Sequence, residues 1–313
     1  MTTHWRKLGL VYSLREHGRP WMKSRAMSPQ PLLFSDRIRV YFSAIEETGT
    51  SRISYADLDR TDPTVVLDVA DEPLLECGSP GLFDDSGTIV NSVFHHDDKV
   101  LLYYTGYNRR VLVPWSNAVG LAISEDGGRS FRKAFRSPVL DRSTDEPYFA
   151  VSATVIKDGG RFRVWYASGT NWLNTGGKAL EPVYVIKHGE SENGIHWRRD
   201  SSVCIPPVDA EESTVSASVI HTDGLYRMWY CFRGSRDFRN GSDAYRIGYA
   251  ESDDGVAWRR DDMRAGIEPG PPGSWDALMQ AYPSVMEVDD RLMMFYNGNG
   301  FGAEGFGCAV SDA

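Results

Sequence analysis

Hydrophobic and polar positions alternate in short runs along the whole chain, and one run in each repeat ends on a pair of aromatic residues. The pairs recur every 62 to 66 residues, at Tyr41-Phe42, Tyr103-Tyr104, Trp165-Tyr166, Trp229-Tyr230 and Phe295-Tyr296. Alternation with a period of two residues predicts β-strands, and no segment has sustained helical periodicity. Five repeats of this length account for all 313 residues.

Each repeat contains the same order of segments. A short polar residue followed by apolar ones stands twelve residues before the second aromatic, as in Ser92-Val93-Phe94, and a polar turn such as "KDGG" separates it from the aromatic run. A third alternating run, such as "YRIGYAES", passes through a tight turn such as "SDDG" into a fourth that begins with an aromatic and a basic pair. Four antiparallel strands repeated five times predict an all-β fold, a single five-bladed β-propeller domain over residues 1–313.

The two ends of the chain complete one repeat between them. The last repeat breaks off in its third strand at "GFGCAVSDA" (305–313), and the N-terminal "HWRKLGLVYS" supplies the missing aromatic, basic pair and fourth strand. We therefore expect residues 4–12 to pair with the C-terminal strand. This pairing would close the ring and remove two exposed strand edges, which otherwise promote aggregation.

Composition and charge exclude several classes of function. The chain is 41% hydrophobic and 25% charged, its net charge is −9, and it has no dense Lys/Arg run, which argues against a nucleic-acid partner. No apolar stretch is long enough for a signal peptide or a membrane span, so we expect a cytoplasmic protein without a membrane partner. Four widely spaced cysteines are interpreted as small buried hydrophobes. No zinc or nucleotide motif occurs, so neither a metal nor a cofactor is predicted, and the oligomeric state stays open.

Strand direction predicts which face of the propeller carries the site. The turns between the first and second strands are short, whereas the connections between the second and third strands are long and variable, and these two sets lie on opposite faces. Near the second face, three acids stand eight residues before the first-strand polar residue: Asp84, Glu146 and Asp276. Asp85 and Glu211 stand one place later. We expect these carboxylates to converge around the central channel, although any single one could be a turn former or a solvated charge.

The long connections add candidates for substrate binding, which are Tyr107, Arg109, Asn171, Trp172, Arg233, Asn297 and Asn299. Each also has a structural interpretation. Trp172 could cover the end of the barrel, Asn297 and Asn299 could form a turn, and Arg233 could pair with a neighbouring acid.

At family level the chain resembles the five-bladed propellers of the arabinanase, xylosidase, invertase and levansucrase superfamily. The resemblance is strongest to stand-alone bacterial propellers regarded as glycosyl hydrolases. The stretches that carry it are "GLFDDSG", "YYTGY", "YRIGYAESDDGVAW", "WDALMQAYPSV" and "YNGNGFG". The turn Ser124–Phe131 also fits the structural Asp-box of sialidase-like propellers.

This resemblance implies roles for individual acids. Members of the superfamily use an Asp of the first blade as base or nucleophile, an Asp of the second to tune pKa, and a Glu of the third as general acid. By position, Asp84 or Asp85 matches the second-blade acid, and Glu146 matches the third. The first blade departs from the pattern, because "RPWMKSRAMSPQPLL" offers Arg25, Lys23, Ser28 and Gln30 but no acid.

The leading hypothesis is a glycoside hydrolase-like enzyme acting on a small glycoside or glycosylated metabolite. Glu146 would be the general acid, and Asp85 or Asp84 together with Asp276 would be the supporting or base carboxylates, because glycoside cleavage needs a proton donor and a second carboxyl group. The missing first-blade acid leaves an alternative. The pocket would then bind a sugar without cleaving it, or act as a phosphorylase, lyase, isomerase or transferase on an anionic sugar. Arg25, Arg109 and Arg233 favour an anionic substrate, and Glu211 and Asp276 are further candidates for the second carboxylate.

Overall fold

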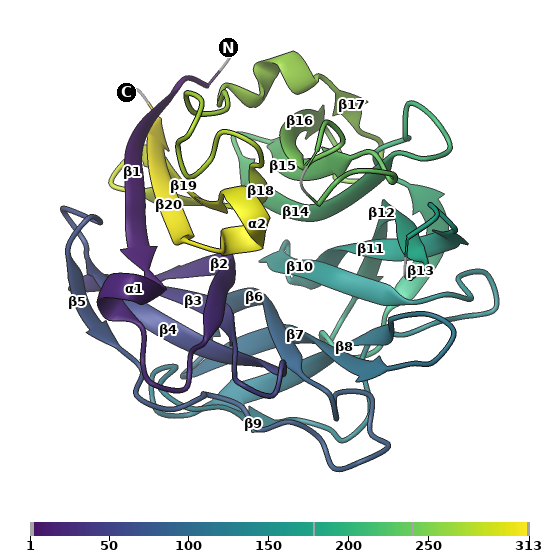
Figure 1. Cartoon of the computed structure of the whole chain (residues 1–313), viewed down its shortest axis with the longest axis horizontal. Helices are drawn as coiled ribbons and strands as arrows, with labels where there is room; N and C mark the ends of the chain where they lie inside the picture. The colour runs from purple at the N-terminus through teal and green to yellow at the C-terminus, as the bar shows by residue number, and fades with distance from the viewer. Residues whose placement is uncertain (1–2, 178, 240, 312–313) are drawn as a thin grey trace.

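Five four-stranded antiparallel sheets form a ring in the computed structural model, which describes residues 3–177, 179–239 and 241–311 (Figure 1). The five-bladed propeller expected from the repeats is confirmed. Each sheet is one blade, with its first strand nearest the centre of the ring.

The strands of each blade follow the order expected from the repeat. Blade 1 consists of β2 (Ser24–Leu33), β3 (Arg37–Ile45), β4 (Ser51–Asp59) and β5 (Val66–Val69). Blade 2 consists of β6 (Thr88–His96), β7 (Lys99–Arg109), β8 (Trp115–Ser124) and β9 (Arg132–Lys133). Blade 3 consists of β10 (Ala150–Asp158), β11 (Arg161–Leu173), β12 (Glu181–Ser191) and β13 (Arg198–Val203). Blade 4 consists of β14 (Ser213–Thr222), β15 (Leu225–Arg233), β16 (Arg246–Ser252) and β17 (Arg259–Arg260).

Blade 5 is built from both ends of the chain. It contains β18 (Ala281–Val288), β19 (Arg291–Asn297), β20 (Gly305–Ser311) and the N-terminal β1 (Trp5–Ser13). The register between β1 and β20 pairs Trp5 with Ser311 and Ser13 with Gly305. The expected closure is therefore confirmed, with a paired segment that begins and ends one residue later than predicted, and Figure 1 shows the two ends side by side.

The first aromatic of three pairs fastens its blade to the next one. Tyr41 and Tyr103 donate hydrogen bonds of 2.9 Å to the carbonyls of Gly128 and Gly194 in the following blades. Trp165 does the same with Gly255 through its indole nitrogen, at 2.9 Å. These carbonyls belong to the tight turns before the fourth strands. The recurrence of an aromatic at this position therefore reflects contacts between neighbouring blades.

The hydrophobic core is divided among the blade interfaces. One cluster, for example, packs Leu32 and Tyr41 of blade 1 against Val90 and Leu102 of blade 2. Cys204, Cys231 and Cys308 are buried as expected, whereas Cys77 is half-buried, and all four are free. The helices α1 (Leu14–His17), η1 (Asp262–Ala265) and α2 (Asn299–Gly302) are single turns, and no helix among the described residues has the length and apolarity to span a bilayer.

Candidate functional site

The three acids that recur at one register are buried inside their own blades. Asp84 accepts a hydrogen bond of 2.9 Å from Tyr104, the second aromatic of its repeat, and lies 2.5 Å from Lys133 Nζ. Asp276 has the same surroundings. It accepts a hydrogen bond of 2.9 Å from Tyr296 and lies 2.6 Å from Lys7 Nζ.

Glu146 is held in the same way in blade 3. Tyr166 lies 2.8 and 2.9 Å from its two carboxylate oxygens, and Arg199 lies 3.4 Å away. Ser201 donates a further bond of 3.1 Å, and the side chain of Glu146 is 1% exposed. Burial, reinforced by the charge of Glu146, raises the pKa of the Tyr166 phenol far above its ordinary value. The hydroxyl therefore stays protonated and donates to the carboxylate.

We call each such set a blade triad: a tyrosine, a carboxylate and a cation of the fourth strand. The four triads are Tyr104–Asp84–Lys133, Tyr166–Glu146–Arg199, Tyr230–Asp262–Arg260 and Tyr296–Asp276–Lys7. In blade 4 the acid comes from η1 instead, and Glu212, which the repeat pattern does not single out, adds a second ion pair to Arg260 at 2.8 Å. The cation is in each case the second member of the repeated basic pair.

Blade 1 lacks all three members of a triad. Its second aromatic is Phe42, its fourth strand β5 has the sequence VLDV, and the position that matches Asp84 is Met22. Phe42 and Met22 belong to one hydrophobic cluster. The missing first-blade acid therefore coincides with the loss of its tyrosine and its cation.

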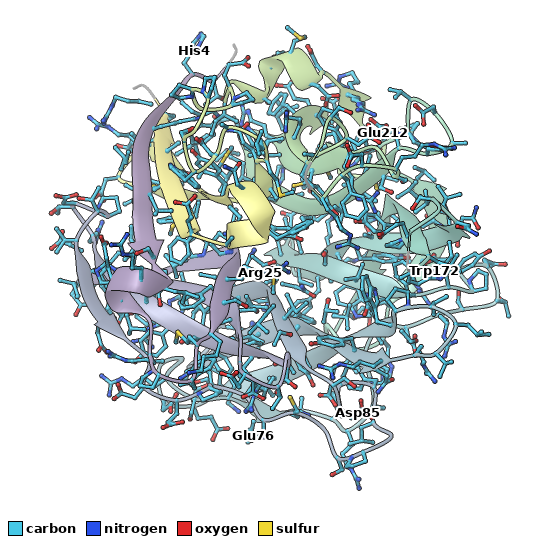
Figure 2. All side chains as sticks on the ribbon, in the orientation of Figure 1. His4, Arg25, Glu76, Asp85, Trp172 and Glu212 are labelled. Carbon is cyan, nitrogen blue, oxygen red and sulfur yellow. The ribbon has the colours of Figure 1, made fainter. Side chains whose placement is uncertain are left out.

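The contacts of the triad acids do not support the expected convergence on the channel, because each acid is bound by a tyrosine and a cation of its own blade. Asp85 lies apart, near the rim of the ring in Figure 2, and accepts bonds of 2.8 Å from Gly81 N and Asn108 Nδ2 and of 2.7 Å from Ser86 Oγ. Burial alone would raise the pKa of Asp85, but these hydrogen bonds outweigh it and lower the pKa. The catalytic roles of Asp84, Asp85, Glu146 and Asp276 stay predictions of the sequence.

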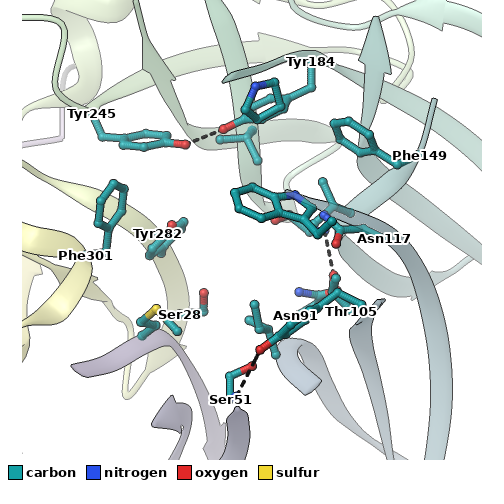
Figure 3. A pocket seen from close by; sticks show the side chains of 18 of the residues that line it. Ser28, Ser51, Asn91, Thr105, Asn117, Phe149, Tyr184, Tyr245, Tyr282 and Phe301 are labelled. Carbon is teal, nitrogen blue, oxygen red and sulfur yellow. Dashed lines mark hydrogen bonds between the residues drawn. The ribbon is translucent and has the colours of Figure 1, made fainter. Parts of the chain in front are cut away.

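A pocket of about 310 Å³ opens at the mouth of the channel, on the face that carries the long connections (Figure 3). All five blades contribute to it, through the starts of first and third strands and the ends of second strands. Eight aromatic side chains line it, namely Tyr107, Trp115, Phe149, Tyr184, Phe238, Tyr245, Tyr282 and Phe301. Among the described residues its lining contains no carboxylate.

Several polar groups of the lining are free to bind a ligand. The side chains of Arg25, Ser28, Asn117 and Ser152 line the pocket, and we find no hydrogen bond from them to another described residue. Ser28 and Ser152 have φ angles of 55° and 52°, in the left-handed region, where the first strands bulge. Such backbone conformations are costly and persist where the surroundings enforce them, which is common at binding sites.

The structure separates the predicted substrate-binding residues into three groups. Arg25 and Tyr107 line the pocket. Behind the lining, Arg233 bonds to two pocket tyrosines, Trp172 packs against Phe149 with ring centroids 5.4 Å apart, and Asn297 accepts a bond of 2.8 Å from Ser28 N.

The remaining four candidates have local partners outside the lining. Asn299 caps the backbone of Leu278 and Met279, and exposed Asn171 accepts a bond from Trp172 N. Glu211 pairs with Arg236. Arg109 donates to Thr48 O at 3.3 Å.

Sequence reasoning missed most of the aromatic lining. Trp115, Tyr184 and Tyr245 stand at or near the starts of third strands, where they continue the alternating pattern that core residues also follow. Their recurrence at the beginning of successive third strands was the available signal. Phe149 and Tyr282 stand at first strands, beside the apolar residues that define the repeat.

Solved structures share this fold across the whole chain. A protein described as a glycoside hydrolase matches with a TM-score of 0.73 and 17% identity, covering 100% of this chain and 92% of the other. A glycosyl hydrolase from Bacteroides ovatus matches with a TM-score of 0.72 and 17% identity, covering 99% and 94%. A protein of the GH130 family, which comprises mannoside phosphorylases and glycoside hydrolases that target β-1,2-mannosidic linkages in Candida mannan, matches with a TM-score of 0.71 and 15% identity, covering 99% and 94%.

The sequence has a nearer relative in Mycobacterium tuberculosis. Uncharacterized protein Rv1502 of strain H37Rv, and its counterpart MT1551 of strain CDC 1551, are 36% identical over 309 residues, which is 98% of each chain. No protein-family model matches the chain. The chain therefore belongs to the family of Rv1502 and has the five-bladed β-propeller fold of glycoside hydrolases, as its resemblance implied.

Proposed function

We propose that the protein binds a small saccharide or glycoside in the mouth pocket without cleaving it through paired carboxylates. The observation that carries this proposal is the lining itself, which combines eight aromatic side chains and several free polar groups with no carboxylate among the described residues. This is the non-hydrolytic alternative that the missing first-blade acid left open.

The shape and chemistry of the pocket suit a sugar. Its volume of about 310 Å³ is near the lower end of small-ligand pockets, about 300 to 1,000 Å³. The faces of aromatic rings carry partial negative charge, so they attract the C–H groups of a sugar ring. The free side chains of Arg25, Asn117, Ser28 and Ser152 can bond to its hydroxyl oxygens.

Hydrolysis would need a pair of carboxyl groups, and the lining has none among the residues that the structure describes. Inverting and retaining glycosidases place two carboxyl groups on either side of the scissile bond. Here the acids nearest to that role by position, Asp84 and Glu146, are bonded to tyrosines and cations of their blades. We therefore assign them to the structure of the blades.

Calorimetric titration with neutral and acidic mono- and disaccharides tests the proposal. Trp115→Ala should weaken binding at least about tenfold, because it removes one aromatic wall. Phe135→Ala is the matched control, because Phe135 is exposed outside the pocket lining, and it should leave binding unchanged. If no saccharide of the panel binds, the proposal is overturned. If both variants lose the same amount of affinity, the saccharide binds at a site other than this pocket.

A glycoside-processing activity is the second candidate, favoured by the hydrolases and phosphorylases among the structures of the same fold. The same saccharides are incubated with the protein, with and without inorganic phosphate, and product release is measured. We expect no release. Release that Glu146→Gln reduces at least about a hundredfold would instead support a general acid at Glu146.

A further inference from the structure

Arg233 is a buried cation without a buried anion. The residue is 1% exposed, and its guanidinium donates to Pro182 O at 2.7 Å, Gly234 O at 2.8 Å and Ser235 Oγ at 3.0 Å. In the described part of the chain no carboxylate lies within ion-pair distance of it. Arg39 is buried to the same extent but forms two bonds of 2.7 Å with Asp57. A buried charge is costly unless an opposite charge compensates it, so Arg233 calls for a separate explanation.

Two tyrosines connect this cation to the pocket. Arg233 Nε donates to the hydroxyls of Tyr184 and Tyr245, at 3.2 and 3.1 Å. Both tyrosines line the pocket, and their hydroxyls are hydrogen-bonded to each other, as Figure 3 shows. One of the two hydroxyl protons is used in that bond, which leaves the other to be donated to a ligand. Because each hydroxyl also accepts a bond from a cation, it is a stronger donor than an ordinary phenol.

Arg25 brings a second uncompensated cation to the same side of the pocket. Its guanidinium lies 5.4 Å from the ring centroid of Phe301, which in turn lies 5.8 Å from that of Tyr245. Burial raises the pKa of the neighbouring Tyr282, and the charges of Arg25 and Arg233 both oppose this shift, so both cations act on the region around Tyr282. No described carboxylate pairs with Arg25, whereas Arg239, also in the lining, forms bonds of 2.8 and 3.1 Å with Glu181.

We propose that the saccharide bound in this pocket carries an anionic group, a carboxylate or a phosphate, which binds between Arg25 and the hydroxyls of Tyr184 and Tyr245. This inference rests on the proposed sugar-binding function and names the class of ligand. The anion would accept hydrogen bonds directly from the guanidinium of Arg25. The positive charge of Arg233 would act on it indirectly, through the two tyrosine hydroxyls. Hydrogen bonds to charged groups are shorter and stronger than neutral ones. The anion corner of the pocket, formed by Arg25, Tyr184 and Tyr245, would therefore set the specificity for acidic over neutral sugars.

The test compares acidic sugars with their neutral counterparts by calorimetric titration of the whole chain. The probes are galacturonate with galactose, glucose 6-phosphate with glucose, and inorganic phosphate alone. At least one acidic sugar should bind about tenfold or more tightly than its neutral counterpart. The carboxylate and phosphate probes distinguish the two sources of charge. Raising the salt concentration should reduce this preference.

Variants show whether the preference comes from this corner. Tyr245→Phe and Arg25→Gln should each remove most of the preference for acidic sugars. Arg132→Gln, which removes an exposed charge of β9 outside the pocket lining, should leave this preference unchanged. Arg233→Lys keeps the positive charge. If this variant is folded, it should retain part of the preference for acidic sugars. Circular dichroism establishes that each variant is folded.

The outcomes separate this inference from the proposed function. Equal affinity for acidic and neutral sugars would overturn the anionic ligand and leave sugar binding intact. Tight binding of inorganic phosphate alongside unchanged binding of neutral sugars would also overturn it, because the anion would then be a separate ligand. Binding of no sugar at all would overturn the proposed function itself.

Discussion

The hydroxyl of Tyr104 donates a hydrogen bond of 2.9 Å to the buried carboxylate of Asp84, whereas Phe42, which occupies the same place in blade 1, has no hydroxyl. The acid that matches Asp84 is also absent from blade 1, where Met22 stands instead. Each tyrosine at this place has a carboxylate partner, which in blade 4 is Asp262 of η1, and blade 1 has neither the tyrosine nor the acid. This relationship is what a structural pair requires, and it accounts for the missing first-blade acid without reference to catalysis.

Exchanging the two side chains should destabilise both blades. Tyr104→Phe removes a donor from buried Asp84, and Phe42→Tyr places a hydroxyl in an apolar cluster, so each should lower the free energy of unfolding by about 1 to 3 kcal/mol. Urea unfolding at neutral pH measures this. A stable Phe42→Tyr variant would show that blade 1 accommodates the missing hydroxyl and would weaken the argument from its absence.

Glu146→Gln distinguishes a structural acid from a catalytic one. The amide keeps an acceptor for Tyr166 but loses the charge that faces Arg199 and Lys187, at 3.4 and 3.8 Å. We expect the free energy of unfolding to fall by about 1 to 3 kcal/mol while sugar binding stays within about threefold of the native protein. Glu192→Gln, an exposed change in the same blade, is the control. Unchanged stability with abolished turnover would contradict the structural assignment.

The fold could be predicted because its signals repeat. Each aromatic pair, tight turn and basic pair has a physical role that recurs in successive blades, as Tyr41 and Tyr103 show by bonding to equivalent turns of the next blade. Strand alternation and turn residues then fix four strands per repeat. The closure by β1 follows because the last repeat lacks one segment that the N-terminus supplies.

The site could be predicted only in part, because recurrence marks structure better than binding. The triad acids recur at one register, which suggests converging catalytic groups, although that recurrence reflects Tyr104, Tyr166 and Tyr296. The pocket instead draws several residues of different types from each blade, and its aromatic residues near the starts of third strands follow the same alternation as the core. Arg25 stands out because it is a cation in a first-strand region that lacks the expected acid, while Tyr184 follows the same alternating pattern as core residues.

Acid should remove a contribution of Glu251 to stability. The pKa of Glu251 is lowered from an ordinary 4.5 to about 2, mainly by a hydrogen bond from Arg264. Burial opposes this shift, and a hydrogen bond from Tyr249 adds to it. A carboxyl group whose pKa is lower in the folded state stabilises the fold above its unfolded pKa, and this contribution is lost as the pH falls from about 4.5 toward 2. Glu251→Gln should therefore cost more free energy of unfolding at pH 6 than at pH 3.

Urea unfolding of the native protein and of Glu251→Gln at both pH values checks this sign. Glu47→Gln, which changes an exposed carboxylate, is the control and should show little difference between the two pH values. An equal cost of Glu251→Gln at pH 6 and pH 3 would show that the contact with Arg264 contributes no pH-dependent stability.

Ring closure by β1 should stabilise both blade 5 and the pocket wall that blade 5 supports. Trp5 packs edge-on against Trp229 of blade 4 with ring centroids 5.7 Å apart and donates to Ala265 O at 3.0 Å, while Lys7 completes the triad of Asp276. Deleting residues 1–12 removes these contacts and exposes the edge of β20. The truncated chain should melt at a lower temperature and bind saccharide more weakly.

Lys7→Met should destabilise the full chain by about 3 to 5 kcal/mol, as expected for an acid left unpaired in the interior, whereas Arg6→Met, an exposed neighbour in the same strand, should not. Scanning calorimetry measures both effects, and a truncated chain that melts like the native protein would show that closure contributes nothing to stability.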